Sequence, residues 1–192
     1  MFNLFTNKTR SKHYSPAALV APHDYSAIDT LVKVIEVSDA EPFIGRLFAR
    51  KFGSPAPDYP RHFVSFYAPK EAEQPIALGY YHQSPFEQCY LGGGLVIDER
   101  AYRRLPAAHR KIIRAAGGIA EHLSIKTFEL LGDHVDAIWG HVGNQQAKKV
   151  DSRVGGLSVS NSEHLMVLWR NQALSQAQKQ QITRKVSDLP PF

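Results

Sequence analysis

The chain has 192 residues and a formal net charge of +5, from 23 Lys and Arg against 18 Asp and Glu. This length predicts a single domain with a substantial core, and one cysteine excludes a framework of internal disulfides. The apolar stretch 91–97 is too short to cross a membrane and no signal-peptide pattern follows residue 10, so we expect a cytoplasmic protein.

The first third of the chain predicts a strand, a helix and a loop. Residues 1–15 are polar, and 17–21 form a strand candidate. Asp29 is a candidate cap for a helix through 31–35, which continues after Pro42 to Phe48. Residues 53–60 contain three prolines and are expected to form a loop.

The middle of the chain changes to strand chemistry and then to helix chemistry. Residues 62–68, 76–83 and 87–97 are rich in β-branched and aromatic side chains, which predicts consecutive antiparallel strands with Ser84-Pro85 at one turn. Apolar residues then recur at spacings of three and four from Pro106 to Leu131, which predicts one long helix that ends at Gly132.

The last third predicts a strand at 137–142, a helix at 145–154, a hairpin at 157–159 and 164–169, and a polar, helix-permissive tail. The order of elements indicates an α+β (mixed α/β) fold with a sheet and helices around one core. We expect one domain over 1–170 and a tail over 171–192.

A cluster of basic residues follows the third predicted strand. Between 100 and 114 there is no acidic residue, and the basic residues are Arg100, Arg103, Arg104, Arg110, Lys111 and Arg114. Cations beside a strand-to-helix turn can bind phosphate together with free backbone N–H groups. A solvated helix face is the simpler interpretation of the charges alone.

A second pattern lies between the strand at 137–142 and the predicted hairpin. Asn144 stands at an N-cap position, Ala147 allows close helix packing, and Gly155 permits a left-handed exit. This spacing resembles the C-terminal half of the Gcn5-related N-acetyltransferase (GNAT) superfamily. Asp151 stands at the position of that family's tyrosine, and Gly156 at the position of its phenylalanine.

The resemblance implies an acyl-CoA N-acyltransferase-like fold, with a central, mostly antiparallel sheet flanked by helices. In that family a loop of the form (Arg/Gln)-x-x-Gly-x-(Gly/Ala) cradles the pyrophosphate of coenzyme A at a helix N-terminus. Arg114, Gly117 and Gly118 match its first elements, and a shift of one residue restores the small residues but loses the arginine. Sixteen residues separate Ile97 from Arg114, which leaves three alternatives: an insertion carries the basic residues, the turn with Arg103 and Arg104 forms the cradle, or the site is lost.

The resemblance also implies direct transfer of an acetyl or other acyl group from acyl-CoA to the amine of a small molecule or protein. Backbone groups of Leu95, Val96 and Ile97 would bind the pantetheine arm, with Asn144 also near the cofactor. Glu87 is the first candidate for the general base, and His82 and His141 are rivals. Asp151 stands at the acid position, where a carboxylate donates a proton poorly unless its pKa is raised.

The remaining sequence features bear on metal binding, on Cys89 and on the shape of the third predicted strand. The nine histidines show no metal-binding spacing, and Cys89 is best interpreted as a small buried residue. The triplet Gly92-Gly93-Gly94 suggests a bulge or a close approach of ligand to backbone. Two alternatives to an acyltransferase stay open: a GNAT-fold protein that binds coenzyme A without catalysis, and a nucleic-acid binder that uses 100–114 with Tyr102 for stacking. Nucleic acid is the least favoured partner, because the region matches no known motif.

Overall fold

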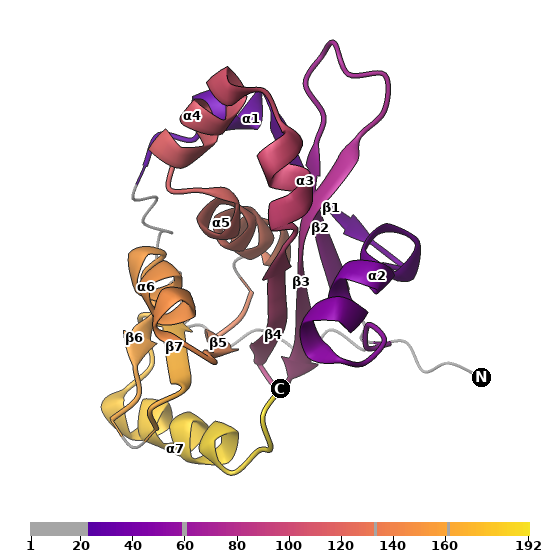
Figure 1. Cartoon of the computed structure of the whole chain (residues 1–192). Helices are drawn as coiled ribbons and strands as arrows, with labels where there is room; N and C mark the ends of the chain where they lie inside the picture. The colour runs from indigo at the N-terminus through magenta and orange to yellow at the C-terminus, as the bar shows by residue number, and fades with distance from the viewer. Residues whose placement is uncertain (1–22, 59–60, 133, 161) are drawn as a thin grey trace, which may run out of the picture.

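The computed structural model describes residues 23–58, 61–132, 134–160 and 162–192 (Figure 1). These residues form one seven-stranded sheet in the order β1-β2-β3-β4-β5-β7-β6. Every neighbouring pair is antiparallel except β4 and β5, which are parallel. The strands are β1 Val32–Val37, β2 Arg61–Tyr67, β3 Ile76–Phe86, β4 Cys89–Ile97, β5 Ala137–His141, β6 Leu157–Ser158 and β7 Leu165–Trp169. The α+β fold class expected from the sequence is confirmed, while the strand candidate at 17–21 lies outside the described residues.

Helices cover both faces of this sheet. One face, named here the α5 face, carries α1 Ser26–Asp29, α3 Glu99–Arg104, α4 Ala107–Ala115, α5 Ile119–Leu131 and α6 Gln145–Arg153. The opposite face, named the α2 face, carries α2 Glu41–Phe52 and α7 Gln176–Ser187. Figure 1 shows α5 and α2 on opposite sides of β3 and β4. None of the described helices has the length and apolar character needed to cross a membrane.

The prediction of a helix at 31–35 is wrong, because this segment belongs to β1. The short helix α1 ends at Asp29, and Val32 to Val37 then pair with β2 in antiparallel register. Three of the six residues of β1 are valine and one is isoleucine, and such β-branched side chains favour a pleated strand over a helix. The helix expected after Pro42 exists separately as α2, with Pro42 in its first turn.

The strand meander is confirmed, but its second turn lies three residues later than expected. Ser84 and Pro85 are part of β3, and Phe86 pairs with Cys89 across a two-residue turn at Glu87 and Gln88. The pairing of β3 with β2 ends at Gln83. At Pro85, β3 is therefore paired with β4 but not with β2. Proline has no N–H to donate, and on the β2 side of this position no ladder hydrogen bond is lost.

The long helix expected from Pro106 to Leu131 is interrupted. Pro106 caps α4, and α4 ends before Gly117 and Gly118, whose φ angles are 83° and 95°. Such positive φ values favour glycine and cannot continue a right-handed helix. The additional helix α3 lies between β4 and α4, so the segment from 99 to 115 forms two short helices ahead of α5.

The expected tail packs against the sheet. Ser175 and Gln178 form a capping box at the start of α7. Val186 is 1% exposed and lies in an apolar cluster on the α2 face with Cys89, Leu91 and Trp139. The helix thus contributes to the core beneath β4 and β5.

Candidate functional site

The two parallel strands at the middle of the sheet separate. β4 and β5 are paired only from Cys89 with Ala137 to Gly92 with Gly140. β4 continues to Ile97, whereas β5 ends at His141. This fork opens into a cleft of about 790 Å³, which is lined by 92–97 of β4, 117–120, 140–144, and the α6 residues Gln146, Ala147, Val150, Asp151 and Arg153.

A β-bulge shapes the β4 side of the fork. Tyr80 pairs with Val96 but His82 pairs with Gly93, so Gly94 and Leu95 together oppose one residue of β3. Gly94 has a φ of 64°, which an L side chain rarely adopts. The bulge expected at the glycine triplet is therefore confirmed.

Beyond the bulge, one edge of β4 pairs with no strand in the part of the chain that the structure describes. The N–H of Asp98 donates to the carbonyl of Leu78 in β3 at 2.7 Å. In an antiparallel ladder, successive residues turn their N–H and C=O groups to alternate sides. Those of Ile97 therefore point away from β3, toward the cleft. A strand edge of this kind can hydrogen-bond an extended ligand.

The start of α5 forms one end of the cleft. Its N-cap is Gly118, and no side chain among the described residues caps the helix or accepts from its first-turn N–H groups. Arg114 and Arg153 line the cleft beside this helix start. A thirteen-residue helix with uncapped N–H groups and two guanidinium groups nearby suits an anionic phosphate group.

A buried carboxylate supports the loop before α5. Glu121 is fully buried and accepts a hydrogen bond from the hydroxyl of Tyr25 at 3.0 Å. Its other oxygen lies 3.7 Å from an Nη atom of Arg153. A Cβ at residue 117 would collide with this carboxylate, so the glycine there is required by a close approach as well as by its φ angle. Glu121 thereby links the loop to α6.

Asp151 lies at the base of the fork on α6. Burial raises the pKa of its carboxyl to about 6. The helix is positioned by Asn144, whose side-chain oxygen accepts from the backbone N–H groups of Gln146 and Ala147 at 3.0 and 2.9 Å. The N–H of Gly156 donates to the Asp151 carbonyl at 2.8 Å.

Tyr81 is a cleft residue that sequence reasoning missed. It reaches the fork from β3 on the α5 face, and a Cβ at residue 92 would collide with its hydroxyl. Burial, followed by the charge of Asp151, raises the pKa of the Tyr81 phenol far above its ordinary value, so it stays protonated at neutral pH. The only sequence signal for it is the small residue at 92, which leaves room for a ring on the neighbouring strand.

His141 and His82 lie on the α2 face of the fork. His141 ends β5 and lines the cleft, and its ring centroid is 5.6 Å from that of His164. Burial, with a smaller effect of His164, lowers the pKa of His141. Burial and His62 likewise lower the pKa of His82 to about 4, so both rings are predominantly neutral at pH 7.

Glu87 lies away from the cleft. It occupies the β3–β4 turn with a φ of 52°, and both of its carboxylate oxygens accept from Nζ of Lys185 on α7, at 2.7 and 3.0 Å. The structure therefore places this candidate base in an exposed ion pair at the opposite end of β4 from the bulge.

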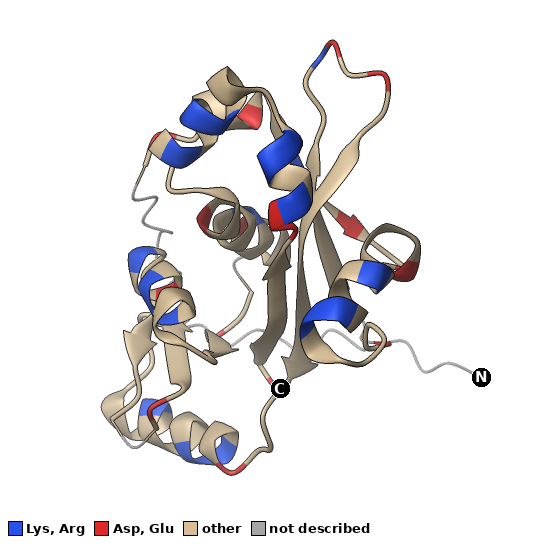
Figure 2. Cartoon of the chain, viewed as in Figure 1, with Lys and Arg blue, Asp and Glu red and all other residues tan. Residues whose placement is uncertain are grey.

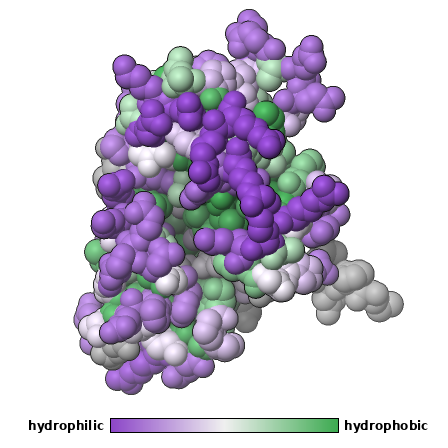
Figure 3. Space-filling model, in the orientation of Figure 1, coloured by the Kyte–Doolittle hydropathy of each residue, from purple (hydrophilic) through white to green (hydrophobic). Residues whose placement is uncertain are grey.

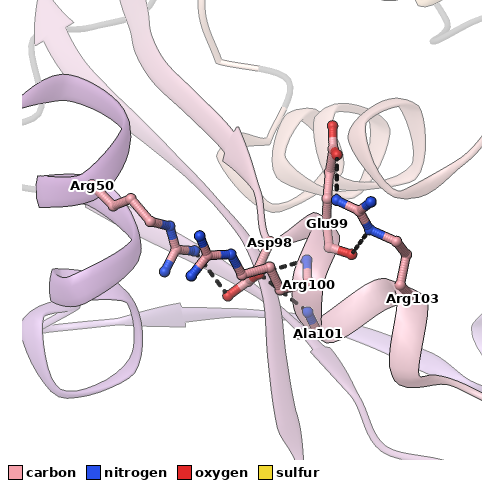
Figure 4. Close-up of polar contacts among 6 residues, drawn as sticks. All are labelled: Arg50, Asp98, Glu99, Arg100, Ala101 and Arg103. Atoms are coloured by element: carbon pink, nitrogen blue, oxygen red, sulfur yellow. Dashed lines mark hydrogen bonds and ion pairs between the residues drawn. The ribbon is translucent and has the colours of Figure 1, made fainter.

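Arg103 and Arg104 also lie outside the cleft lining, unlike Arg114. Figure 4 shows Arg103 paired within α3 to Glu99, with its Nη2 3.3 Å from the carboxylate. The same figure shows Asp98 capping α3 while Arg50 of α2 donates to it at 3.4 Å. Acidic residues just before the basic stretch thus offset part of its charge.

The surface around the cleft is basic. Figure 2 shows Lys and Arg on α2, α3, α4 and α6. In Figure 3 hydrophobic atoms lie at the centre of the same face and hydrophilic side chains frame them. This arrangement suits a ligand with an anionic part and a slender apolar part.

The sequence matches no protein-family model and no curated protein. Its structure is similar to that of a provisionally assigned acetyltransferase from Exiguobacterium sp. 255-15, with 13% identity, a TM-score of 0.44, and coverage of 82% of this chain and 99% of the other. Apo FdhC, a nucleotide-linked sugar GNAT, has 10% identity and a TM-score of 0.45 over 82% of this chain and 94% of its own. A domain from Methanocaldococcus jannaschii DSM 2661 has 12% identity and a TM-score of 0.45 over 72% and 99%. Because these identities and TM-scores are low, the similarities carry no argument about function, which has to be argued from the residues of the cleft.

Proposed function

We propose that this chain is a divergent GNAT-like N-acyltransferase that moves an acetyl or other acyl group from acyl-CoA directly to an amine. The observation that supports this most is the fork between β4 and β5, which leads from an unpaired strand edge to the uncapped start of α5 beside Arg114 and Arg153. Coenzyme A combines an extended pantetheine arm with phosphate groups, and the cleft offers complementary groups to both.

Binding would divide between two parts of the cleft. The backbone groups of Ile97 point toward the cleft from the unpaired part of β4 and, with Leu95 beside them, suit the amide groups of the pantetheine arm, whereas those of Val96 are turned to Tyr80 of β3. The N–H groups around Gly117 and Gly118 and the nearby guanidinium groups suit the diphosphate. No such role is proposed for Arg103 or Arg104.

The bound thioester would supply an activated acyl group, and the protein would handle the protons. Tyr81 keeps its proton at neutral pH and lines the cleft together with Asp151, whose charge it senses. Asp151 and His141 line the same cleft and are largely unprotonated at pH 7, so either can accept a proton from an ammonium group, directly or through water. We propose these three residues, rather than Glu87, as the proton-transfer groups.

Titration calorimetry with acetyl-CoA tests the binding step, for which we expect a dissociation constant of about 1–100 μM, in the usual range for metabolic substrates. Release of free thiol in the presence of a panel of amines tests the transfer step. Absence of both heat and thermal stabilisation at about 1 mM acetyl-CoA, some tenfold above that range, would remove the proposal.

A coenzyme-binding protein without catalysis is the second candidate. It is favoured by Asp151, which stands where the family has a tyrosine. Calorimetric binding of acetyl-CoA without thiol release for any amine of the panel would select this candidate. A change of the binding heat with amine present would instead favour a transferase that lacks its proper acceptor in the panel.

A further inference from the structure

Residues 189–192 cross the α2 face of the sheet at the fork. The ring of Phe192 packs edge-on against His141, with centroids 5.9 Å apart. Its backbone lies on β4, because a Cβ at residue 93 would collide with the Phe192 carbonyl carbon and stand 2.6 Å from its oxygen. Val186 and Leu189 join the cluster beneath β4 and β5 that anchors the preceding helix. The segment therefore touches both strands where they diverge.

The other walls of this opening come from β3 and α2. His82 pairs with Gly93 and so projects on the same face, and its ring contacts Phe48 of α2, with centroids 6.4 Å apart. Lys51 and Phe52 of α2 line the cleft, which thus extends to this face. Aromatic and imidazole rings frame the opening, with one lysine at its edge.

The opposite face of the fork carries the groups suited to the coenzyme. Asp151, Tyr81 and the start of α5 all lie on the α5 face. A second substrate that meets an acyl group at the fork must approach from the remaining side. On that side Phe192 packs against His141 and Gly93, two residues that line the cleft, and α2 contributes Lys51 and Phe52 to the lining.

We propose that segment 189–192 is the acceptor-side wall of the cleft and that Phe192 determines which amines reach the fork. This inference rests on the acyltransferase function proposed above. An opening framed by the rings of Phe192, His82 and Phe48 suits a primary amine on a slender apolar or aromatic body. It excludes a lysine on the surface of a folded protein, which would require the wall to move.

The same wall should also limit hydrolysis of acetyl-CoA, which can be measured without knowing the acceptor amine. With Phe192 in place, water has limited access to a thioester at the fork. In its absence water can replace the amine, so that acetyl-CoA and water give acetate and free coenzyme A thiol.

The test compares Phe192→Ala, Phe192→Trp and the unchanged full chain. The control is Phe43→Ala, since Phe43 is a half-exposed ring on α2 that packs on Phe66 and does not line the cleft. Thiol release is measured without amine and with primary amines of increasing width, and the acetyl-CoA dissociation constant is measured for each protein.

We expect Phe192→Ala to raise amine-independent thiol release about threefold or more and to admit wider amines, with acetyl-CoA affinity within about twofold of the unchanged chain. Phe192→Trp should narrow the range of amines, and Phe43→Ala should change neither property. The inference is overturned if Phe192→Ala and Phe192→Trp match the unchanged chain in hydrolysis and amine range, or if no protein hydrolyses acetyl-CoA. If the unchanged chain binds no acetyl-CoA, the proposed function itself fails, and the two failures are thereby distinguished.

Discussion

The carboxylate of Asp151 on α6 lies against Gly140 of β5, where a Cβ would stand 2.8 Å from its Oδ2 atom. The glycine lets an acidic side chain lie against the sheet at the point where β4 and β5 separate. The cost is the desolvation that raises the pKa of Asp151 to about 6. The Asp151 carboxylate is therefore a candidate proton acceptor. Its ionisation should also change the free energy of unfolding by a measurable amount.

Asp151→Asn should stabilise the protein at high pH. The pKa of Asp151 is raised on folding, so its contribution is fully present below the unfolded value near 4 and is lost as pH rises through about 6. With allowance for solvent near a partly exposed residue, we expect a gain of about 1–2 kcal/mol at pH 8 and none below pH ~4. Urea unfolding at pH 4, 6 and 8 measures this. Asp58→Asn, at an exposed position, is the control, and a gain that does not depend on pH would contradict the assignment.

Arg114→Ala should weaken the binding of acetyl-CoA. Arg114 lines the cleft beside the start of α5, whereas Arg104 does not line it. Loss of a charge-assisted hydrogen bond to phosphate predicts a dissociation constant about 10–100 times higher. Calorimetry on Arg104→Ala should give a value within about twofold of the unchanged chain, because only distant charge is lost. Equal weakening by both variants would indicate a diffuse electrostatic effect instead of a phosphate site.

Gly92→Ala should destabilise the fold. The added methyl group would overlap the hydroxyl of Tyr81, and that ring is buried and cannot move aside easily. We expect a loss of about 1–3 kcal/mol in the free energy of unfolding. Gly143→Ala is the matched control, because no atom lies within 4 Å of a Cβ there and φ is not in the left-handed range. Denaturant titration of both variants decides the matter, and equal stability would show that Tyr81 has room to shift.

Glu87→Gln should leave catalysis unchanged. Glu87 is bound to Lys185 with both side chains about half exposed, so the ion pair contributes less than about 1 kcal/mol and weakens with salt. We expect kcat/KM within about twofold of the unchanged chain, while Asp151→Asn lowers kcat by about tenfold or more. A large loss of kcat in Glu87→Gln with normal acetyl-CoA affinity would return Glu87 to the candidate bases.

Much of the local structure could be predicted from the sequence. The β-branched runs predicted the meander of β2, β3 and β4, Asn144 predicted the start of α6, and the glycine triplet predicted the bulge. The sequence-based prediction is wrong for Val32 to Val37, where the spacing of apolar residues fits a helix as well as a strand. Pairing with β2, a contact between distant parts of the chain, makes this segment a strand.

The sequence by itself determined which residue types could bind a phosphate, bend a strand or cap a helix, because these properties depend on side-chain chemistry and neighbours along the chain. Only the tertiary structure decided which of them meet. It brings Tyr81 of β3 to Asp151 of α6, directs Glu87 to Lys185, and lays Phe192 across Gly93. These contacts join residues far apart in the chain, and they form because the whole sheet and its two helical layers bury their apolar surfaces together, which no local pattern encodes.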